Sequence, residues 1–362
     1  MQYKDQISEI ASHIRPELID FKASRAKGKM PSLVSSEFLT NKEQGDWAEN
    51  TLFSAINSSS KNIIAVRYGK NDNISAGDAG FKEFFEQYQN ELDTIGKRPD
   101  LLLFEKKDFP YETLDISGFD QNDLDQIVPK AKCGIEVRSS SYLVDQHVRD
   151  AKSERKQAAD EIFRIQEIIR TNYNDILRQK DPVLFDTVMR INNDNMHEIE
   201  YRCRNWKSTN ELQQLSGYLK EIKEHLNDLA KRQSLSITPK VEDLRVVYTW
   251  IQKYNVPHYY VQVFFDKAYG ISFQKILSLI ADDEKEGQEY SIARDPKNQR
   301  KPTIKINACN EICILDKIAL PEHYSEMKTL NKGRLLFYVR FKESNAVINQ
   351  DGFKDLFKVT LE

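Results

Sequence analysis

Residues 98–104 read RPDLLLF and residues 133–141 read CGIEVRSSS, and these two short stretches decide the fold. Pro99 cannot lie in the interior of a helix, because its ring removes a backbone donor and collides with the preceding turn. The apolar residues that follow Asp100 are typical of a short strand covered on both faces. The first stretch therefore predicts a buried strand with a carboxylate at its start.

The second stretch predicts another strand, and its two faces differ in chemistry. Successive side chains of a strand point to opposite faces, so Glu136 and Arg138 project together, opposite Ile135 and Val137. If the two strands are neighbours, Asp100 and Glu136 can share a hard cation. Mg²⁺ is held by one or two carboxylates, keeps several waters and contacts phosphate oxygens. Because such an ion positions water for attack on phosphorus, the pattern favours phosphodiester hydrolysis.

A simpler interpretation of the two acids stays open. Pro-Asp dipeptides are common in turns, and an isolated glutamate in a strand usually faces solvent. However, Glu136 lies between apolar residues in a strand that we expect to be central, where an unpaired carboxylate is costly. This position favours a functional role for Glu136.

Length and charge set broad limits on the protein. The chain has 362 residues, enough for one large domain or two ordinary ones. Its 53 basic and 56 acidic residues give a net charge of −3, so the total charge does not indicate a nucleic-acid binder. A ligand responds to charges within roughly 8 to 10 Å, so local clusters matter more than the total. The sequence contains no P-loop motif and no nucleophile elbow.

Features of membrane and secreted proteins are not evident in the sequence. The longest apolar runs, such as the one around residues 263–265, are too short to cross a bilayer. Charged residues interrupt the apolar residues of Met1–Ile10, which argues against a secretory signal. The four cysteines are too few and too scattered for a disulfide framework, and Cys309 and Cys313 lack partners at zinc spacing. We expect a soluble, cytoplasmic protein without a membrane partner.

Periodicity along the chain predicts alternating helices and strands around a long helical segment. We expect three regions: residues 1–144 with N-terminal helices and the first half of a core, residues 145–232 as a helical insertion, and residues 233–362 as the second half of the core. Helices are expected near the N-terminus and over residues 44–57, 81–92, 241–254 and 273–280, and strands over residues 62–68, 101–104, 133–139, 259–265, within 289–316 and over 334–341.

The helical segment carries apolar residues that alternate by three and four. They are Leu212, Leu215, Leu219, Ile222, Leu226 and Leu229. This spacing is that of a coiled-coil seam, which packs either inside the protein or against a partner. Both interpretations stay open.

Residues 98–100 and 134–140 resemble the core of the PD-(D/E)XK nucleases, on strands in the same order. The later run over residues 256–273, VPHYYVQVFFDKAYGISF, is similar to runs in type II restriction endonucleases, in particular the AccI-like group. The resemblance extends from about residue 44 to 316, interrupted by the helical segment. It implies an α/β (α+β) fold, with a restriction-endonuclease-like central mixed sheet flanked by helices and a helical insertion.

The resemblance also implies site residues. Asp100 and Glu136 would hold the metal, and Glu49 matches the helical acid that many such nucleases place nearby, although a solvated helix charge is an equal alternative. The sequence departs from the family pattern at Arg138, where a lysine is usual. Arginine stays protonated and cannot take a proton from water, but it can orient water or stabilise charge on phosphorus. Lys240 is a candidate for the missing lysine.

A local basic cluster supplies candidate DNA contacts between residues 291 and 310. Arg, Asn and Gln are the side chains that contact guanine and adenine edges through paired hydrogen bonds. A basic hairpin entering the major groove and an ordinary solvated hairpin are equal alternatives. The candidate DNA-binding residues are Arg294, Lys297, Asn298, Gln299, Arg300, Lys301 and Lys305.

These observations lead to one expected function and two rivals. We expect an Mg²⁺-dependent type II restriction endonuclease that hydrolyses double-stranded DNA at a short (pseudo)palindromic site. A homodimer is expected, because a two-fold symmetric protein reads a palindrome naturally. A cognate methyltransferase is expected to share the site. The rivals are a nuclease of the same core that acts in repair or on branched DNA, and a non-enzymatic protein that binds partners through its helical segment.

Overall fold

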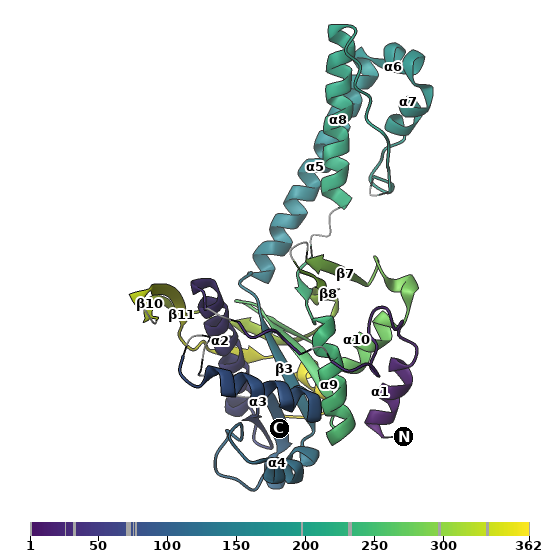
Figure 1. Ribbon diagram of the computed structural model, residues 1–362. Coiled ribbons are helices and arrows are strands. Elements are labelled where there is room, and N and C mark those ends of the chain that lie inside the picture. Colours follow the sequence, from purple (N-terminus) through teal and green to yellow (C-terminus); the bar gives the residue numbers. More distant parts are fainter. Residues whose placement is uncertain are drawn as a thin grey trace. The chain divides into compact units, whose positions relative to one another are not determined.

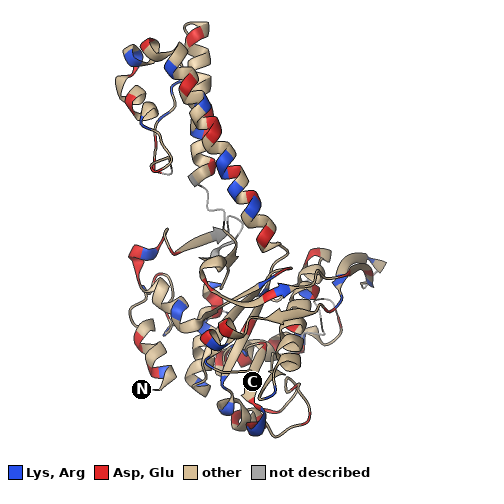
Figure 2. Ribbon diagram, turned by 180° about the vertical axis from the view of Figure 1, so that it is seen from behind, with Lys and Arg blue, Asp and Glu red and all other residues tan. Residues whose placement is uncertain are grey.

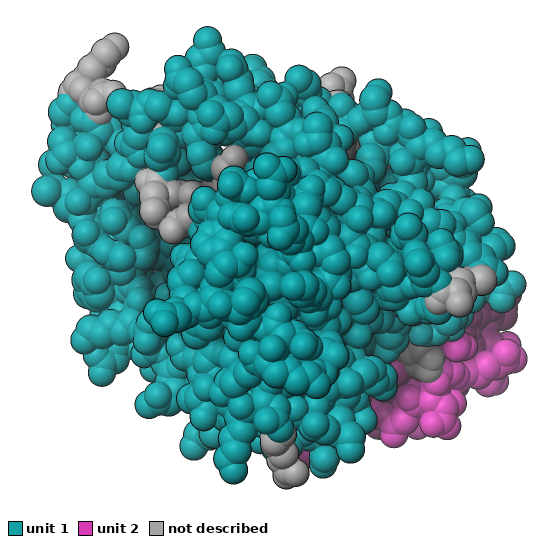
Figure 3. Space-filling model, turned by 90° about the horizontal axis from the view of Figure 1, so that it is seen from below, with its two compact units in different colours: residues 1–144, 235–362 teal, residues 145–234 magenta. Residues whose placement is uncertain are grey.

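A computed structural model describes residues 2–25, 27–31, 34–69, 74, 76, 78–196, 198–230, 234–295, 298–330 and 333–361, with the backbone alone at residues 230, 294, 295 and 298–301. The chain divides into two compact units (Figure 3). Unit 1 contains residues 1–144 and 235–362, and unit 2 contains residues 145–234.

A seven-stranded sheet forms the centre of unit 1, in the order β1-β2-β3-β5-β6-β9-β12. Its strands are β1 (Ile63–Arg67), β2 (Leu101–Glu105), β3 (Cys133–Ser139), β5 (His258–Val263), β6 (Ala268–Ser272), β9 (Ile312–Ile318) and β12 (Ala346–Ile348). Strands β3 and β5 are parallel, and every other neighbouring pair is antiparallel. The mixed sheet expected from the sequence is confirmed.

Helices cover both faces of this sheet (Figure 1). On one face lie α2 (Ser36–Ser59) and α11 (Gln350–Phe357), which share an apolar core with the strands. On the other face lie α1 (Tyr3–Ala11), α4 (Gln121–Ile127), α9 (Val241–Tyr254) and α10 (Phe273–Ile280). Helix α3 (Phe81–Thr94) contacts α9. The α/β fold class is therefore confirmed.

The two cores explain why residues 101–104 are apolar at every position. Leu102 and Phe104 belong to the core under α9, whereas Leu101 and Leu103 belong to the core under α2. All four side chains are fully buried. A strand between two helical layers needs apolar side chains on both faces, as the sequence of β2 predicted.

Two smaller sheets complete unit 1. Strands β4 (Ser236–Ile237), β8 (Asn298–Asn307) and β7 (Tyr290–Asp295) form one, and β10 (His323–Thr329) and β11 (Leu335–Phe341) form the other. Strands β10 and β12 and helix α11 were not expected from the sequence. Strand β10 is largely exposed and β12 has only three residues, so neither strand has a long buried apolar face to signal it.

Unit 2 consists of helices α5 (Val144–Asn172), α6 (Asn174–Lys180), α7 (Pro182–Met189) and α8 (Asn210–Ala230). The seam of residues 212–229 is buried in this unit's own core, together with Ile162, Ile165 and Ile169 of α5. Of the two interpretations that the sequence left open, the structure supports the internal one, because these side chains are covered within unit 2. Acidic and basic residues are interspersed along these helices (Figure 2).

Gly134 on β3 packs closely against Pro99, and a substitution at Gly134 tests this contact. A Cβ atom at this position would lie 2.6 Å from Cγ of Pro99 and 3.2 Å from Cη2 of Trp250. We expect Gly134→Ala to lower the free energy of unfolding by about 1 to 3 kcal/mol, because an overpacked core must shift. Denaturant unfolding measures this change. Gly118→Ala is the control, since no atom lies within 4 Å of its Cβ position; equal stability of the two variants would contradict the prediction.

Candidate active site

The backbone of neighbouring strands brings Asp100 and Glu136 into one site. Leu101 of β2 pairs with Ile135 of β3. This pairing places Asp100 beside the residues of β3 that come after Ile135. Asp100 Oδ2 accepts a hydrogen bond of 2.6 Å from the backbone N–H of Val137. The expected proximity of the two strands is thus confirmed, and the hydrogen bond fixes the Asp100 carboxylate against β3.

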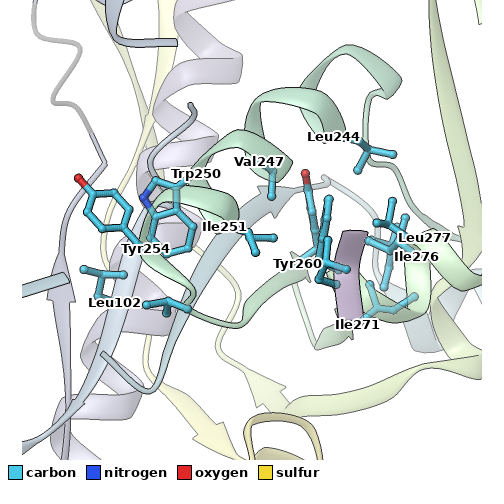
Figure 4. Close-up of a cluster of buried hydrophobic side chains, with 14 of the residues drawn as sticks. Leu102, Leu244, Val247, Trp250, Ile251, Tyr254, Tyr260, Ile271, Ile276 and Leu277 are labelled. Atoms are coloured by element: carbon cyan, nitrogen blue, oxygen red, sulfur yellow. The ribbon is translucent and has the colours of Figure 1, made fainter. Parts of the chain in front are cut away.

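Glu136 is the most deeply buried charged residue of this cluster. It is 1% exposed and pairs across the parallel β3–β5 ladder with Tyr260, which lies among apolar side chains of α9 and α10 (Figure 4). Its Oε1 contacts the Lys97 ammonium and lies 3.0 Å from an Nη atom of Arg138. A buried carboxylate needs such partners, because desolvation of an unpaired charge is costly.

Lys97 is a site residue that the sequence interpretation did not identify. It precedes Asp100 by three residues, whereas the family pattern directed attention to the position two residues after Glu136. Its backbone N–H donates to Val246 O of α9 at 3.0 Å. Gly96 permits this close contact: its φ is +91°, and a Cβ there would lie 2.2 Å from Val246 O.

Asp243, in the first turn of α9, joins the two cations from the opposite side. Its Oδ2 lies 2.5 Å from an Nη atom of Arg138 and 3.7 Å from Nζ of Lys97. The cluster therefore alternates in sign, with Lys97 and Arg138 each between Glu136 and Asp243. No motif in the sequence pointed to Asp243, because it lies 105 residues from Arg138.

Burial and neighbouring charges shift the pKa values of this cluster. Burial, followed by the charge of Glu136, raises the pKa of Asp100 to about 7. Burial alone lowers the pKa of Lys97 and of Arg138, but Glu136 and Asp243 outweigh it and raise both above their ordinary values. The same cations outweigh burial at Asp243 and lower its pKa. Both cations therefore stay protonated at neutral pH.

Glu49 and Lys240, the other two candidates, differ in their positions. Burial, then the charges of Asp100 and other acids including Glu136, raises the pKa of Glu49 well above its ordinary value, so Glu49 on α2 lies within electrostatic reach of the site. Lys240 is exposed and immediately precedes α9. Its charge acts on Asp243, and no ion pair joins it to Glu136 among the described residues. Lys97, not Lys240, lies against Glu136.

The structure describes only part of the hairpin that is expected to contact DNA bases. Lys297 lies outside the described residues, as do the side chains of Arg294, Asn298, Gln299, Arg300 and Lys301. The backbones of β7 and β8 pair as an antiparallel hairpin. Lys305 on β8 is exposed, while the flanking Ile304 and Ile306 are buried. Lys305 thus faces away from the core, as a residue that contacts DNA must.

The carboxylates of Asp100 and Glu136 suit the metal ion that the sequence implies. Glu136 Oε2 is buried and has no hydrogen-bond partner in the described part of the chain. Asp100 accepts its hydrogen bond through Oδ2. A hard cation such as Mg²⁺ uses one or two carboxylates and completes its coordination with water and phosphate oxygens, so these two residues fit it. No group of three or more His, Cys, Asp or Glu side chains among the described residues is placed to hold a metal.

The fold is a mixed α/β sheet flanked by helices, and two carboxylates and two cations gather at the start of β2 and on β3. The sequence matches the family model of the AccI restriction endonuclease over residues 1–361. The chain therefore belongs to the AccI restriction endonuclease family and is a type II site-specific deoxyribonuclease, a hydrolase. No curated protein and no solved structure gave a match. None of the helices within the described residues has the length and apolar character needed to span a membrane.

The raised pKa of Asp100 predicts how stability depends on pH. In the unfolded chain an aspartate has a pKa of about 3.9, whereas in the folded protein the pKa of Asp100 is raised to about 7. Between these values the folded state holds the extra proton, so this group lowers stability as pH rises from about 4 to 7. We expect Asp100→Asn, measured in EDTA, to melt a few degrees above the natural protein at pH 8 and by less at pH 5.

Thermal unfolding at several pH values measures this difference. Asp351→Asn, an exposed substitution in the first turn of α11, is the control. A melting difference between Asp100→Asn and the natural protein that does not grow with pH would contradict the prediction.

Proposed function

We propose that this restriction endonuclease cuts phosphodiester bonds of double-stranded DNA at a site of the PD-(D/E)XK type, with Asp100 and Glu136 as ligands of Mg²⁺. The observation that carries the proposal is the buried Glu136 Oε2, which has no partner among the described residues although Lys97 and Arg138 contact Oε1. When bound, a divalent ion acidifies water and offsets negative charge at phosphorus.

Lys97 takes the role that the family pattern gives to a lysine after the glutamate. Its raised pKa keeps it protonated, so it serves as a fixed positive charge and hydrogen-bond donor and not as a base. Together with Arg138 it contacts Glu136 and faces the phosphate, whose negative charge increases in the transition state. Arg138 cannot accept a proton from water and has the same supporting role.

Asp243 positions both cations. Without it, Lys97 and Arg138 would carry two positive charges against the single carboxylate of Glu136. Because Asp243 contacts both, the cluster is neutral enough to remain buried before DNA arrives. Glu49 is auxiliary, as an acid within electrostatic reach of Asp100.

DNA recognition is assigned to the β7–β8 hairpin, with Arg294, Lys297, Asn298, Gln299, Arg300, Lys301 and Lys305 as the contacting residues. The density of basic and amide residues between positions 294 and 305 supports this assignment. We further propose a homodimer acting on a (pseudo)palindromic site, and a methyltransferase that modifies the same site without necessarily binding this protein.

The function is tested by incubating the purified protein with a long phage DNA and Mg²⁺ and sizing the products. Discrete fragments of constant size, dependent on the divalent ion, are expected. A smear of products, cleavage limited to nicked or branched DNA, or no cleavage would each contradict the proposed function.

Glu136→Gln tests the metal ligand while it keeps the size of the side chain. We expect the rate of cleavage to fall by about a thousandfold, because a lost metal ligand costs about 4 kcal/mol in the transition state. Binding of the same DNA, measured in EDTA, is expected to persist. Cleavage at the natural rate by this variant would overturn the assignment of Glu136.

Lys97→Met and Lys240→Met distinguish the two candidate lysines. We expect Lys97→Met to lower kcat by about a hundredfold or more, as expected for loss of a donor at the reacting phosphate. Lys240→Met should leave kcat within about twofold, because Lys240 is exposed and does not contact Glu136. Single-turnover cleavage measures both rates, and the reverse order would assign the role to Lys240.

A further inference from the structure

The segment between α1 and α2 is held firmly against two helices, although its sequence resembles an ordinary polar loop. Arg25 Nε lies 3.0 Å from Asp93 of α3, and its guanidinium also donates to Gln89 O at 3.1 Å. The backbone N–H of Gly28 donates to Gln89 Oε1 at 3.0 Å. Gln89 is 7% exposed, so this side chain is a buried anchor for the segment.

Helix α9 holds the same segment from a second direction. Arg245 donates to Ser24 O at 3.2 Å. Figure 1 shows the chain after α1 passing by α9 on its way to α2. We call residues 21–31 the N-terminal strap. Contacts to both α3 and α9 fix its path next to the helix that carries Asp243.

A cavity of about 1620 Å³ lies between the strap, α3, the first turns of α9 and the β7–β8 hairpin. Lys27, Gly28 and Lys29 line it from the strap, and Asp243 and Arg245 line it from α9. Pockets for small molecules occupy roughly 300 to 1,000 Å³, so this cavity suits a segment of polymer better. Asp243 lines this cavity and contacts Arg138 and Lys97, so the cavity adjoins the proposed active site through Asp243.

The basic side chains that line this cavity differ in whether they form ion pairs. Arg15 is paired with Asp283 and Glu286, and Arg25 is paired with Asp93. Lys27 and Lys29 are exposed, and no acidic side chain within the described residues lies at ion-pair distance from either. The cavity is also lined by Glu17, Glu242 and Arg245, so Lys27 and Lys29 are the cations that the strap itself offers to an anionic ligand.

We propose that Lys27 and Lys29 bind phosphate groups of the duplex next to the bond that is cut, with the strap as one wall of the DNA-binding cleft. This inference rests on the proposed function, because it takes the Asp100–Glu136 cluster as the cutting site. Lysine contacts to phosphate are independent of sequence, so the strap contributes affinity and orientation while the β7–β8 hairpin reads bases.

The test measures binding without cleavage. Fluorescence anisotropy of a short mixed-sequence duplex in EDTA is recorded at several salt concentrations for the natural protein and for Lys27→Ala/Lys29→Ala. Each lost phosphate contact reduces the slope of log K against log salt by about 0.9, so we expect a reduction of about 1.8. Affinity at low salt should fall by about tenfold.

Two further variants make the result specific. Lys27→Arg/Lys29→Arg keeps both charges and should bind as the natural protein does, which separates loss of charge from loss of folding. Lys61→Ala/Lys354→Ala removes two exposed lysines elsewhere on unit 1 and should leave the slope unchanged. An unchanged slope for Lys27→Ala/Lys29→Ala, or an equal loss in the control pair, would overturn the proposal.

Failure of this inference is distinguishable from failure of the proposed function. If Glu136→Gln loses cleavage while the strap variant keeps its salt slope, the active site stands and the strap assignment is wrong. If Glu136→Gln still cuts DNA but Lys27→Ala/Lys29→Ala has a reduced salt slope, the strap binds phosphate. In that case the assignment of the active site to Asp100 and Glu136 is wrong.

Discussion

The buried carboxylate of Glu136 is the constraint on which the active site depends. At 1% exposure this charge is stable only with cations in direct contact, and Lys97 and Arg138 supply them. Two cations beside one carboxylate leave an excess of positive charge, which Asp243 of α9 balances. One buried charge on β3 therefore fixes the loop before β2 and the start of α9.

This arrangement gives the site two kinds of carboxylate. Asp100 is held by a backbone N–H and has a raised pKa, whereas Asp243 is held by two cations and has a lowered one. Glu136 lies between them with one oxygen bound and the other without a partner among the described residues. Such an inequality suits the proposed metal site, because a carboxylate oxygen without a protein partner can coordinate a cation while an ion-paired carboxylate can position its neighbours.

In the rest of unit 1, elements that are far apart in the sequence have different roles. The central sheet and its two helical layers set the position of the charged cluster. The strap, α3, α9 and the β7–β8 hairpin surround the adjoining cavity. Unit 2 has its own apolar core and keeps its leucine seam inside it.

The sequence by itself determined the strands of the core, because local pattern carries that information. Pro99 and the apolar residues after Asp100 required a buried strand, and the alternation around Glu136 required another with acid and base on one face. Helices α9 and α10 span residues 241–254 and 273–280, as their patterns predicted. These features depend on residues that are close in the chain.

Only the tertiary structure decided which distant residues complete the site. Asp243 and Arg138 are 105 residues apart, and no periodicity in either segment indicates that they meet. Lys97 was overlooked for the same reason, because its role depends on Gly96 bringing the loop against Val246 of α9. The fate of the leucine seam was likewise undecided, since the same spacing serves an internal core and an interface. Pattern specifies the elements, but contacts between elements depend on packing that the sequence does not display locally.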